Sequence, residues 1–537
     1  MMDAALTTNI WVSKGTQYRF AEEALPEPPR KTAVCFSGGG TRAMSAAMGQ
    51  LRGLRALNLI DKIGYISCVS GGSWASTIYT YYQTGAANDD ELLGPIITPK
   101  ETSMAQLKQL PTTRLGYPAT LSLRDKLLEL HEAGTPDDLL WQEGIGRIYF
   151  APFGIDDSEG LRFFSLDETT VADILQRNPQ LDRGQFVTVR EADGKRPFLI
   201  INGSLIGPKA LAPLEHDQLT GFDMTPLYTG IPFGQTITYH PLLKDAETRP
   251  IGSGYVESFA FGSSAPDSLL DDCEGTDLPT KCTVKVPGVK RPFTLTLASG
   301  ISSAAFASIL DKITSVIDPD MLYWPIQSPA QPQAESFNFG DGGDIENYGL
   351  LSLLLRKVNR VVIFVNSETK LNLDYDPSQP PEKGDIDTFL PPLFGFPTSM
   401  FPNNTVFTQD ALVQVVHALQ EKKRQGEPLV TVQTHTVQQN DWWGIEGGWE
   451  ATVCWVYNDR VKSWEEQLPE EIQRDIDRGN ESLIDFGPFK HFPNYKTMLE
   501  NGLDLVELTP EQVNLLADLS CWNMLQSQDL LESLFAD

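Results

Sequence analysis

The chain has 537 residues, of which 41% are hydrophobic and 21% are charged. This composition excludes a disordered chain and a small disulfide-stapled domain, and it indicates a folded globular protein. Because 42 Lys and Arg face 71 Asp and Glu, the formal net charge is -29, which excludes a broad basic surface for nucleic acid. The same charge repels anionic lipid headgroups, so any membrane contact has to be hydrophobic or local.

The start of the chain shows no charged segment followed by an apolar run, so no secretory signal is recognisable. Apolar stretches elsewhere are far shorter than a membrane span. We therefore expect a cytoplasmic or peripherally membrane-associated protein without a transmembrane segment.

Two strand–turn–helix units are predicted near the start. A β-like run over Lys31–Phe36 ends in a triple glycine, and apolar residues recur at helical spacing from Thr41. A second β-like run, Tyr65–Val69, ends at Ser70-Gly71-Gly72 and is again followed by helical spacing. This order predicts parallel strands joined by a right-handed crossover.

A long excursion over residues 85–333 separates these units from the next recognisable α/β elements. It contains short runs that we predict as strands: Phe198–Asn202, Gln235–Tyr239 and Phe293–Leu297.

The α/β alternation returns near residue 337. A strand reaches Gly340-Asp341-Gly342-Gly343, Leu350–Leu355 read as a helix, and Val361–Val365 read as a buried strand. Near the end, Thr509-Pro510-Glu511-Gln512 has the spacing of a helix capping box.

Ser70 is the candidate nucleophile. It stands between a predicted strand and helix with glycine directly after it, as a nucleophile elbow requires, although Cys68 replaces the usual first glycine. Consecutive backbone amides in a glycine loop can bind an oxyanion, so Gly38, Gly39 and Gly40 are candidates for that role.

Dinucleotide binding is the alternative for the triple glycine, since Gly38-x-Gly40-x-x-Ala43 has the required spacing. That function needs an acidic residue at the end of the second strand, where Ser70 stands, while Asp61 precedes that strand. We therefore favour a hydrolase.

Asp341 is the candidate base, because its glycine neighbours permit close backbone approach. A simple Asp-Gly turn is the alternative. The six histidines stand in no motif that recommends a triad, so a dyad of Ser70 and Asp341 is the simpler hypothesis.

Three segments together resemble a known family: Ser37-Gly38-Gly39-Gly40-Thr41-Arg42-Ala43-Met44, Val69-Ser70-Gly71-Gly72-Ser73-Trp74 and Asp341-Gly342-Gly343. They are similar to the patatin-like lipid acyl hydrolases, and within them to the catalytic domain of cytosolic phospholipase A2 and fungal phospholipase B. The resemblance implies a Ser70–Asp341 dyad, an oxyanion hole at Gly38, Gly39 and Gly40, and a contact of Arg42 with the substrate phosphate. The spacing of the cysteines, histidines and acidic residues predicts no metal site, and we expect no cofactor, while calcium dependence stays open.

Two departures from the family pattern concern lipid binding. About thirty residues precede the glycine loop in this sequence, so we expect the calcium-binding lipid-docking domain of some members to be missing here. Those members also carry an arginine soon after the strand that follows the catalytic Asp, where this chain reads Asn366-Ser367-Glu368. One phosphate contact is therefore expected to be missing.

Two further segments leave alternatives open. The Pro-rich apolar stretch Phe389–Pro397, with Met400 and Phe401, is either an exposed interfacial patch or a loop packed on the core. Cys273 and Cys282 can be bridged, but we expect two reduced thiols in a hairpin.

The expected architecture is a three-layer α/β patatin-like fold with a central, mostly parallel sheet. We expect a lead-in over residues 1–30 and a single catalytic domain over 31–537, with a cap inserted within 85–333. The expected function is a phospholipase A or lysophospholipase acting on lipid at a membrane or micelle surface. A lipid transacylase and a non-catalytic lipid-binding module are the alternatives, and the oligomeric state stays open.

Overall fold

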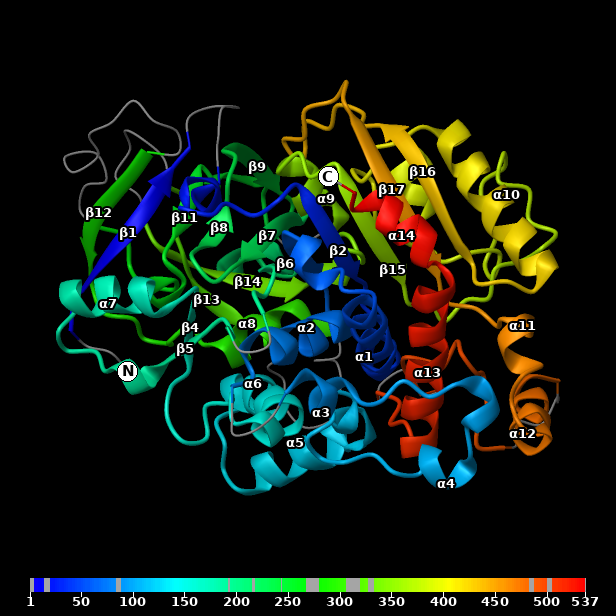
Figure 1. Cartoon of the computed structure of the whole chain (residues 1–537). Helices are drawn as coiled ribbons and strands as arrows, with labels where there is room; N and C mark the ends of the chain where they lie inside the picture. Colours follow the sequence, from blue (N-terminus) through cyan, green and yellow to red (C-terminus); the bar gives the residue numbers. More distant parts are fainter. Residues whose placement is uncertain are drawn as a thin grey trace.

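The computed structural model describes residues 4–13, 20–83, 88–191, 194–214, 218–242, 244–266, 280–305, 319–326, 333–481, 487–499 and 505–536. Within these ranges thirteen strands form one sheet, in the order β12-β1-β11-β8-β7-β6-β3-β2-β15-β17-β16, with β13 and β14 attached beside β6 (Figure 1). The strands are β1 (Leu6–Val12), β2 (Thr32–Phe36), β3 (Tyr65–Cys68), β6 (Phe198–Pro208), β7 (Thr220–Met224), β8 (Thr229–Ile231), β11 (Gly254–Val256), β12 (Thr280–Val286), β13 (Asp320–Tyr323), β14 (Glu335–Asp341), β15 (Arg360–Val365), β16 (Val430–Thr436) and β17 (Glu450–Tyr457).

The centre of the sheet is parallel and its flanks are antiparallel. Strands β6, β3, β2, β15 and β17 run parallel to one another. On one side of this centre the sheet continues antiparallel through β7, β8, β11, β1 and β12. On the other side β16 pairs antiparallel with β17 and forms the edge. The carboxyl ends of β2 and β3 therefore meet at the same edge, which brings the two predicted glycine turns together.

Helices cover both faces of the sheet, so the predicted three-layer α/β class is confirmed. On β2, Val34 and Phe36 point into one hydrophobic cluster, and Ala33 and Cys35 point into another. The first cluster contains α1 (Gly40–Ala56), α2 (Gly71–Tyr81), α8 (Leu295–Ser302) and α13 (Pro510–Gln526). The second contains α9 (Leu350–Leu355) and α10 (Gln409–Gln425).

The remaining elements lie around this framework (Figure 1). The helices are α3 (Asp89–Leu93), α4 (Met104–Leu107), α5 (Leu123–Glu132), α6 (Leu140–Ile145), α7 (Glu168–Arg177), α11 (Lys462–Glu465), α12 (Glu470–Glu481) and α14 (Gln528–Leu534). Two small ribbons complete the described elements: β4 (Phe163–Ser165) with β5 (Phe186–Thr188), and β9 (Gln235–Tyr239) with β10 (Glu247–Ile251). Among the described residues, none of the helices combines the length and the apolar character needed to cross a bilayer.

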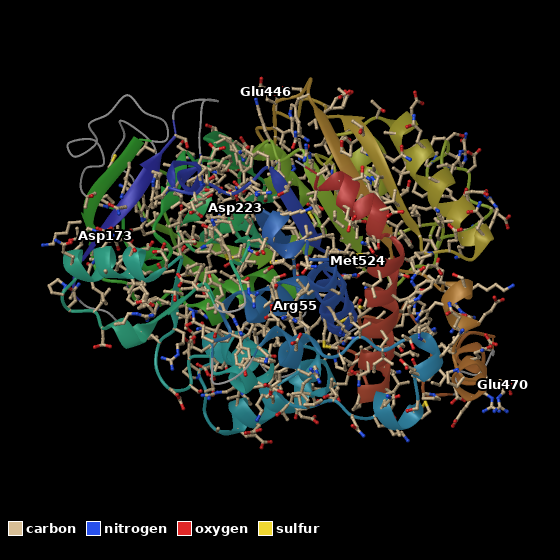
Figure 2. The ribbon with its side chains drawn as sticks, in the orientation of Figure 1. Arg55, Asp173, Asp223, Glu446, Glu470 and Met524 are labelled. Atoms are coloured by element: carbon tan, nitrogen blue, oxygen red, sulfur yellow. The ribbon has the colours of Figure 1, made fainter. Side chains whose placement is uncertain are left out.

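Helices α1 and α13 lie side by side, as Figures 1 and 2 show. Two glycines of α1 make this approach possible, because a Cβ at Gly49 would overlap the carbonyl oxygen of Ala517 and one at Gly53 would lie 2.5 Å from Met524 Cβ. The predicted capping box at the start of α13 is confirmed, with Thr509 as the N-cap residue. The last helices of the chain thus support α1, which begins at the glycine loop.

The excursion over 85–333 supplies much of the sheet as well as surface helices. Its strands β6, β7, β8, β11, β12 and β13 all join the main sheet. The prediction of a strand over Phe293–Leu297 is wrong, because Leu295–Ser302 form helix α8 with Thr294 as its N-cap. A short apolar run fits a buried helix as well as a strand, and here packing beside α2 and β6 selects the helix.

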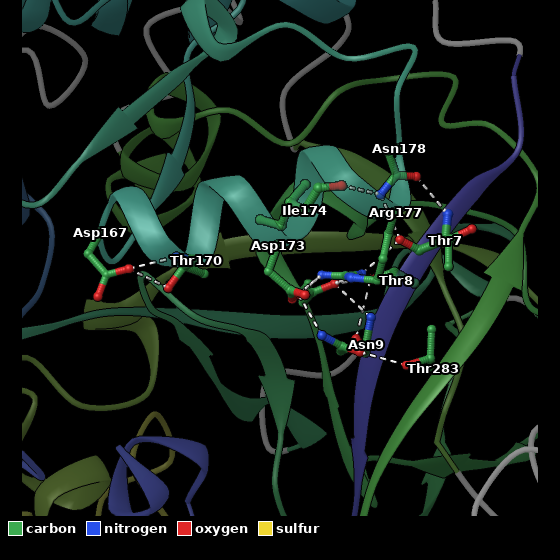
Figure 3. A network of polar contacts seen from close by, with 11 residues as sticks. Thr7, Thr8, Asn9, Asp167, Thr170, Asp173, Ile174, Arg177, Asn178 and Thr283 are labelled. Atoms are coloured by element: carbon green, nitrogen blue, oxygen red, sulfur yellow. Dashed lines mark hydrogen bonds and ion pairs between the residues drawn. The ribbon is translucent and has the colours of Figure 1, made fainter. Parts of the chain in front are cut away.

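Residues 6–12 near the start of the chain also belong to the sheet, since they form β1 between β12 and β11. Figure 3 shows how helix α7 is fastened to this strand. Asn178 donates from its side chain to the carbonyl oxygen of Thr7 (2.8 Å), and the guanidinium of Arg177 pairs with buried Glu257 (2.7 Å), which also accepts from the N–H of Asn9 (2.6 Å). The segment expected as a lead-in thus contains a strand whose polar groups are paired.

The cysteine expectation is wrong for Cys282, which is disulfide-bonded on β12. Cys273 lies outside the described residues. The other four cysteines, at 35, 68, 454 and 521, are buried and reduced.

Candidate active site

Ser70 occupies a sharp turn between β3 and α2. Its backbone has φ 51° and ψ -124°, a left-handed conformation that non-glycine residues rarely adopt, and its side chain is buried. The two following glycines permit this turn, because a Cβ at Gly71 would overlap the carbonyl oxygen of Gly40 and one at Gly72 would overlap that of Phe36. The geometry is that of a nucleophile elbow, despite Cys68.

Asp341 reaches Ser70 because β6 is longer than its parallel partner. The first residues of β6 pair with β3. The rest of β6 extends beyond the carboxyl end of β3 and pairs antiparallel with β14. Asp341, the last residue of β14, lies opposite Gly203. The Ser70 hydroxyl donates to Asp341 Oδ2 over 3.0 Å. In the part of the chain that the structure describes, neither residue is bonded to a histidine.

The environment of Asp341 favours its protonated form. Burial, followed by the nearby carboxylate of Asp344, raises the pKa of Asp341 from its ordinary value to about 8. Hydrogen bonds to the carboxylate act in the opposite direction and come from the N–H of Gly343 (2.7 Å), from Ser70 and from the N–H of Ala305 (3.3 Å). A carboxyl with a pKa in this range is suited to exchanging a proton near neutral pH.

The glycine loop lies against Ser70, since a Cβ at Gly38 would stand 3.1 Å from Ser70 Cβ. The N–H of Gly38 donates to the carbonyl oxygen of Asn347 (3.0 Å). For the N–H groups of Gly39 and Gly40, where α1 begins, the described residues provide no acceptor. These two amides are thus the ones available to a ligand at the turn.

Arg42 is buried beneath the same loop and holds distant segments together. Its Nε donates to the carbonyl oxygen of Asn366 (2.8 Å), and its Nη1 donates to the carbonyl oxygen of Tyr495 and to Thr497 Oγ1 (2.8 Å). The remaining nitrogen, Nη2, lies against Gly39, where a Cβ would overlap it. Nη2 is therefore the Arg42 nitrogen for which the described residues provide no hydrogen-bond acceptor.

Two residues near the dyad were not anticipated from the sequence. Ser302, the last residue of α8, accepts from the Ser70 N–H (3.1 Å) and donates to the carbonyl oxygen of Asn202 (2.6 Å). The half-buried carboxamide of Asn347 lies between the glycine loop and the turn that follows Asp341, against Gly38 and Gly343. Its position six residues after Asp341 carried no signal that could be recognised without the structure.

The apolar stretch Phe389–Pro397 is packed on the core rather than displayed as an interfacial patch. Leu390, Leu393 and Phe394 are fully buried, and the Phe394 ring packs against those of His435 and Trp455. Burial lowers the pKa of His435 to about 4, so this histidine is neutral at physiological pH. Of the residues that were candidates for a patch, Pro397 and Met400 are exposed.

Comparison with curated proteins finds similarity to cytosolic phospholipase A2 proteins. The chain is 43% identical to human cytosolic phospholipase A2 zeta over 86 residues, which are 16% of this chain and 10% of that protein. It is 31% identical to the human beta protein over 101 residues (16% and 13%) and 49% identical to the mouse gamma protein over 49 residues (9% and 8%). The matches thus span about a tenth of the length of these relatives. No family model matches the chain.

Among solved structures, the chain is similar to human GIVD cytosolic phospholipase A2, with a TM-score of 0.43 and 14% identity over 95% of this chain and 61% of that one. The same protein in complex with methyl gamma-linolenyl fluorophosphonate gives a TM-score of 0.40 and 13% identity, over 94% and 59%. The sequence matches confirm the resemblance to a family of lipid hydrolases. That family is the cytosolic phospholipase A2 proteins.

Proposed function

We propose that the protein is a phospholipase A or lysophospholipase that cleaves lipid acyl esters through Ser70 and Asp341. The observation that carries this proposal is the 3.0 Å hydrogen bond from a strained, buried serine to a buried carboxylate beside a glycine loop. The similarity of part of the chain to cytosolic phospholipase A2 proteins supports a phospholipid as the substrate.

The proposed reaction is an acyl transfer in two steps. Asp341 takes the Ser70 proton as Oγ attacks the ester carbonyl carbon, and the amides of Gly39 and Gly40 bind the resulting oxyanion. When the intermediate collapses, protonated Asp341 gives its proton to the departing alkoxide and the acyl group stays on Ser70. Water, deprotonated by Asp341, then releases the fatty acid and restores the serine.

Two neighbouring groups are proposed to orient the substrate. The Asn347 carboxamide presents its oxygen Oδ1 to Gly38 and Gly343, where it is proposed to accept a hydrogen bond from a donor on the substrate. Arg42 Nη2 is proposed to contact the headgroup phosphate, while its other nitrogens keep the guanidinium in place. The protein is proposed to bind its lipid substrate at a membrane or micelle surface.

The test is release of fatty acid from phosphatidylcholine and lysophosphatidylcholine by the purified chain, beside Ser70→Ala and Asp341→Ala. Either substitution should lower the rate at least about a thousandfold while circular dichroism stays unchanged, as for residues that act as a unit. A non-catalytic lipid-binding module would bind lipid and be indifferent to both substitutions. Transfer of the acyl group to an added alcohol, in preference to water, would identify a transacylase.

A further inference from the structure

Glu368 lies beside Arg42, the residue proposed to contact the headgroup phosphate, and changes the charge that a ligand meets there. Glu368 Oε2 lies 3.6 Å from Arg42 Nη1 and accepts a hydrogen bond from the N–H of Thr497 (3.0 Å). The Glu368 side chain is 42% exposed, whereas that of Arg42 is 4% exposed. The pair is therefore a dipole with its positive end inside, against the glycine loop, and its negative end outside.

Glu368 keeps its negative charge at neutral pH. Burial alone would raise its pKa, but Arg42, the Thr497 N–H and Lys496 outweigh burial and hold the pKa below its ordinary value. An anion that approaches Arg42 from solvent thus comes close to the Glu368 carboxylate first, and the two negative charges repel each other.

The charges of a zwitterionic lipid headgroup are arranged in the complementary order. Its phosphate lies next to the glycerol esters and its ammonium lies farther out. With the scissile ester at Ser70, the phosphate comes to the inner Arg42 and the ammonium to the outer Glu368. An anionic headgroup that lacks the ammonium offers Glu368 nothing and is repelled by it.

We propose that Arg42 and Glu368 together select choline and ethanolamine lipids over anionic phospholipids, with Glu368 as the residue that determines this specificity. The inference rests on the proposed function, since it assumes that a phospholipid ester is bound at Ser70. It assigns to Glu368 a contact with the headgroup cation.

The experiment compares phosphatidylcholine with phosphatidylglycerol of the same short acyl chains, both below their critical micelle concentrations, so that surface charge plays no part. The ratio of kcat/KM for the two lipids is measured for the parent chain, Glu368→Gln and Glu368→Lys. Glu446→Gln, which removes an exposed acid that pairs with Lys357, is the matched control. Thermal melts check that each variant is folded.

The parent chain should prefer the choline lipid by about fivefold, the scale of a half-exposed ion pair. Glu368→Gln should bring the ratio close to one, Glu368→Lys should invert it, and Glu446→Gln should leave it unchanged. Hydrolysis of both lipids at a ratio that the Glu368 variants do not change would overturn the inference and leave the proposed function standing. If the parent chain hydrolyses no phospholipid, both are overturned.

Discussion

The hydroxyl of Ser70 donates to Oδ2 of Asp341 although the two residues lie 271 positions apart in the chain. The contact depends on β6, which pairs with β3 at one end and with β14 at the other. One strand therefore sets the positions of both proposed catalytic groups, and the rigidity of the sheet keeps their distance short.

Backbone strain at Ser70 predicts that glycine is more stable than alanine at this position. Both substitutions remove the hydroxyl, but only glycine adopts φ 51° and ψ -124° without steric cost. Ser70→Gly should unfold in urea with a free energy about 1–3 kcal/mol higher than Ser70→Ala, while both are inactive. Equal stability of the two variants would show that the turn is unstrained.

The raised pKa of Asp341 predicts the position of the acidic limb of the activity profile. The base works when it is ionised, so kcat/KM should rise with pH, and the midpoint of this rise should lie near the Asp341 pKa of about 8. Asp344→Asn removes the like charge and should move the rise to lower pH, whereas the exposed control Asp410→Asn should not move it. A rise centred at the ordinary pKa of a carboxyl, unchanged in Asp344→Asn, would contradict this assignment.

Close contact of the two glycine turns predicts that Gly71 cannot carry a side chain. A Cβ there would stand 2.6 Å from the backbone nitrogen of Gly40 and would overlap its carbonyl oxygen, so Gly71→Ala has to displace the loop that offers the proposed oxyanion amides. Activity should fall at least about a hundredfold, the usual effect of losing one oxyanion donor. Gly300→Ala is the control, because its nearest neighbours lie at an ordinary 3.7 Å. Equal activity of the two variants would exclude this role for the loop.

A buried ion network around Arg356 predicts a large stability effect. Arg356 is fully buried and pairs with Glu22 (2.9 Å) and with Asp223 (2.8 Å), which Figure 2 labels. Arg356→Met leaves two buried carboxylates without their cation and should lower the free energy of unfolding by about 3–5 kcal/mol. Arg183→Met breaks an exposed pair with Glu168 and should cost at most about 1 kcal/mol in the same urea titration. Similar losses in the two variants would argue against the network as a stabilising element.

The local units of this site could be predicted from sequence, and its long-range contacts could not. The strand–turn–helix units β2–α1 and β3–α2 were predicted from glycine turns that follow apolar runs. This was possible because the spacing of apolar residues in a strand or a helix is a local pattern. The contact between Ser70 and Asp341 depends on strand order, which no local pattern encodes. The surroundings of Arg42 likewise come from Asn366 and Tyr495, far along the chain.

One wrongly predicted segment and one that was left open show where local patterns stop being informative. The run Phe293–Leu297 was too short to separate a strand from a buried helix, and the structure makes it part of α8. The apolar stretch from Phe389 satisfied the composition of both a buried loop and a lipid-contacting patch, and only packing against Trp455 decides between them.

The most direct test of the Ser70 assignment is labelling with a fluorophosphonate, followed by intact mass measurement and peptide mapping. The parent chain should gain a single adduct at Ser70, Asp341→Ala should react at least about a hundredfold more slowly, and Ser70→Ala should not react. An adduct on another residue, or undiminished labelling of Ser70→Ala, would contradict the dyad as the source of the chemistry.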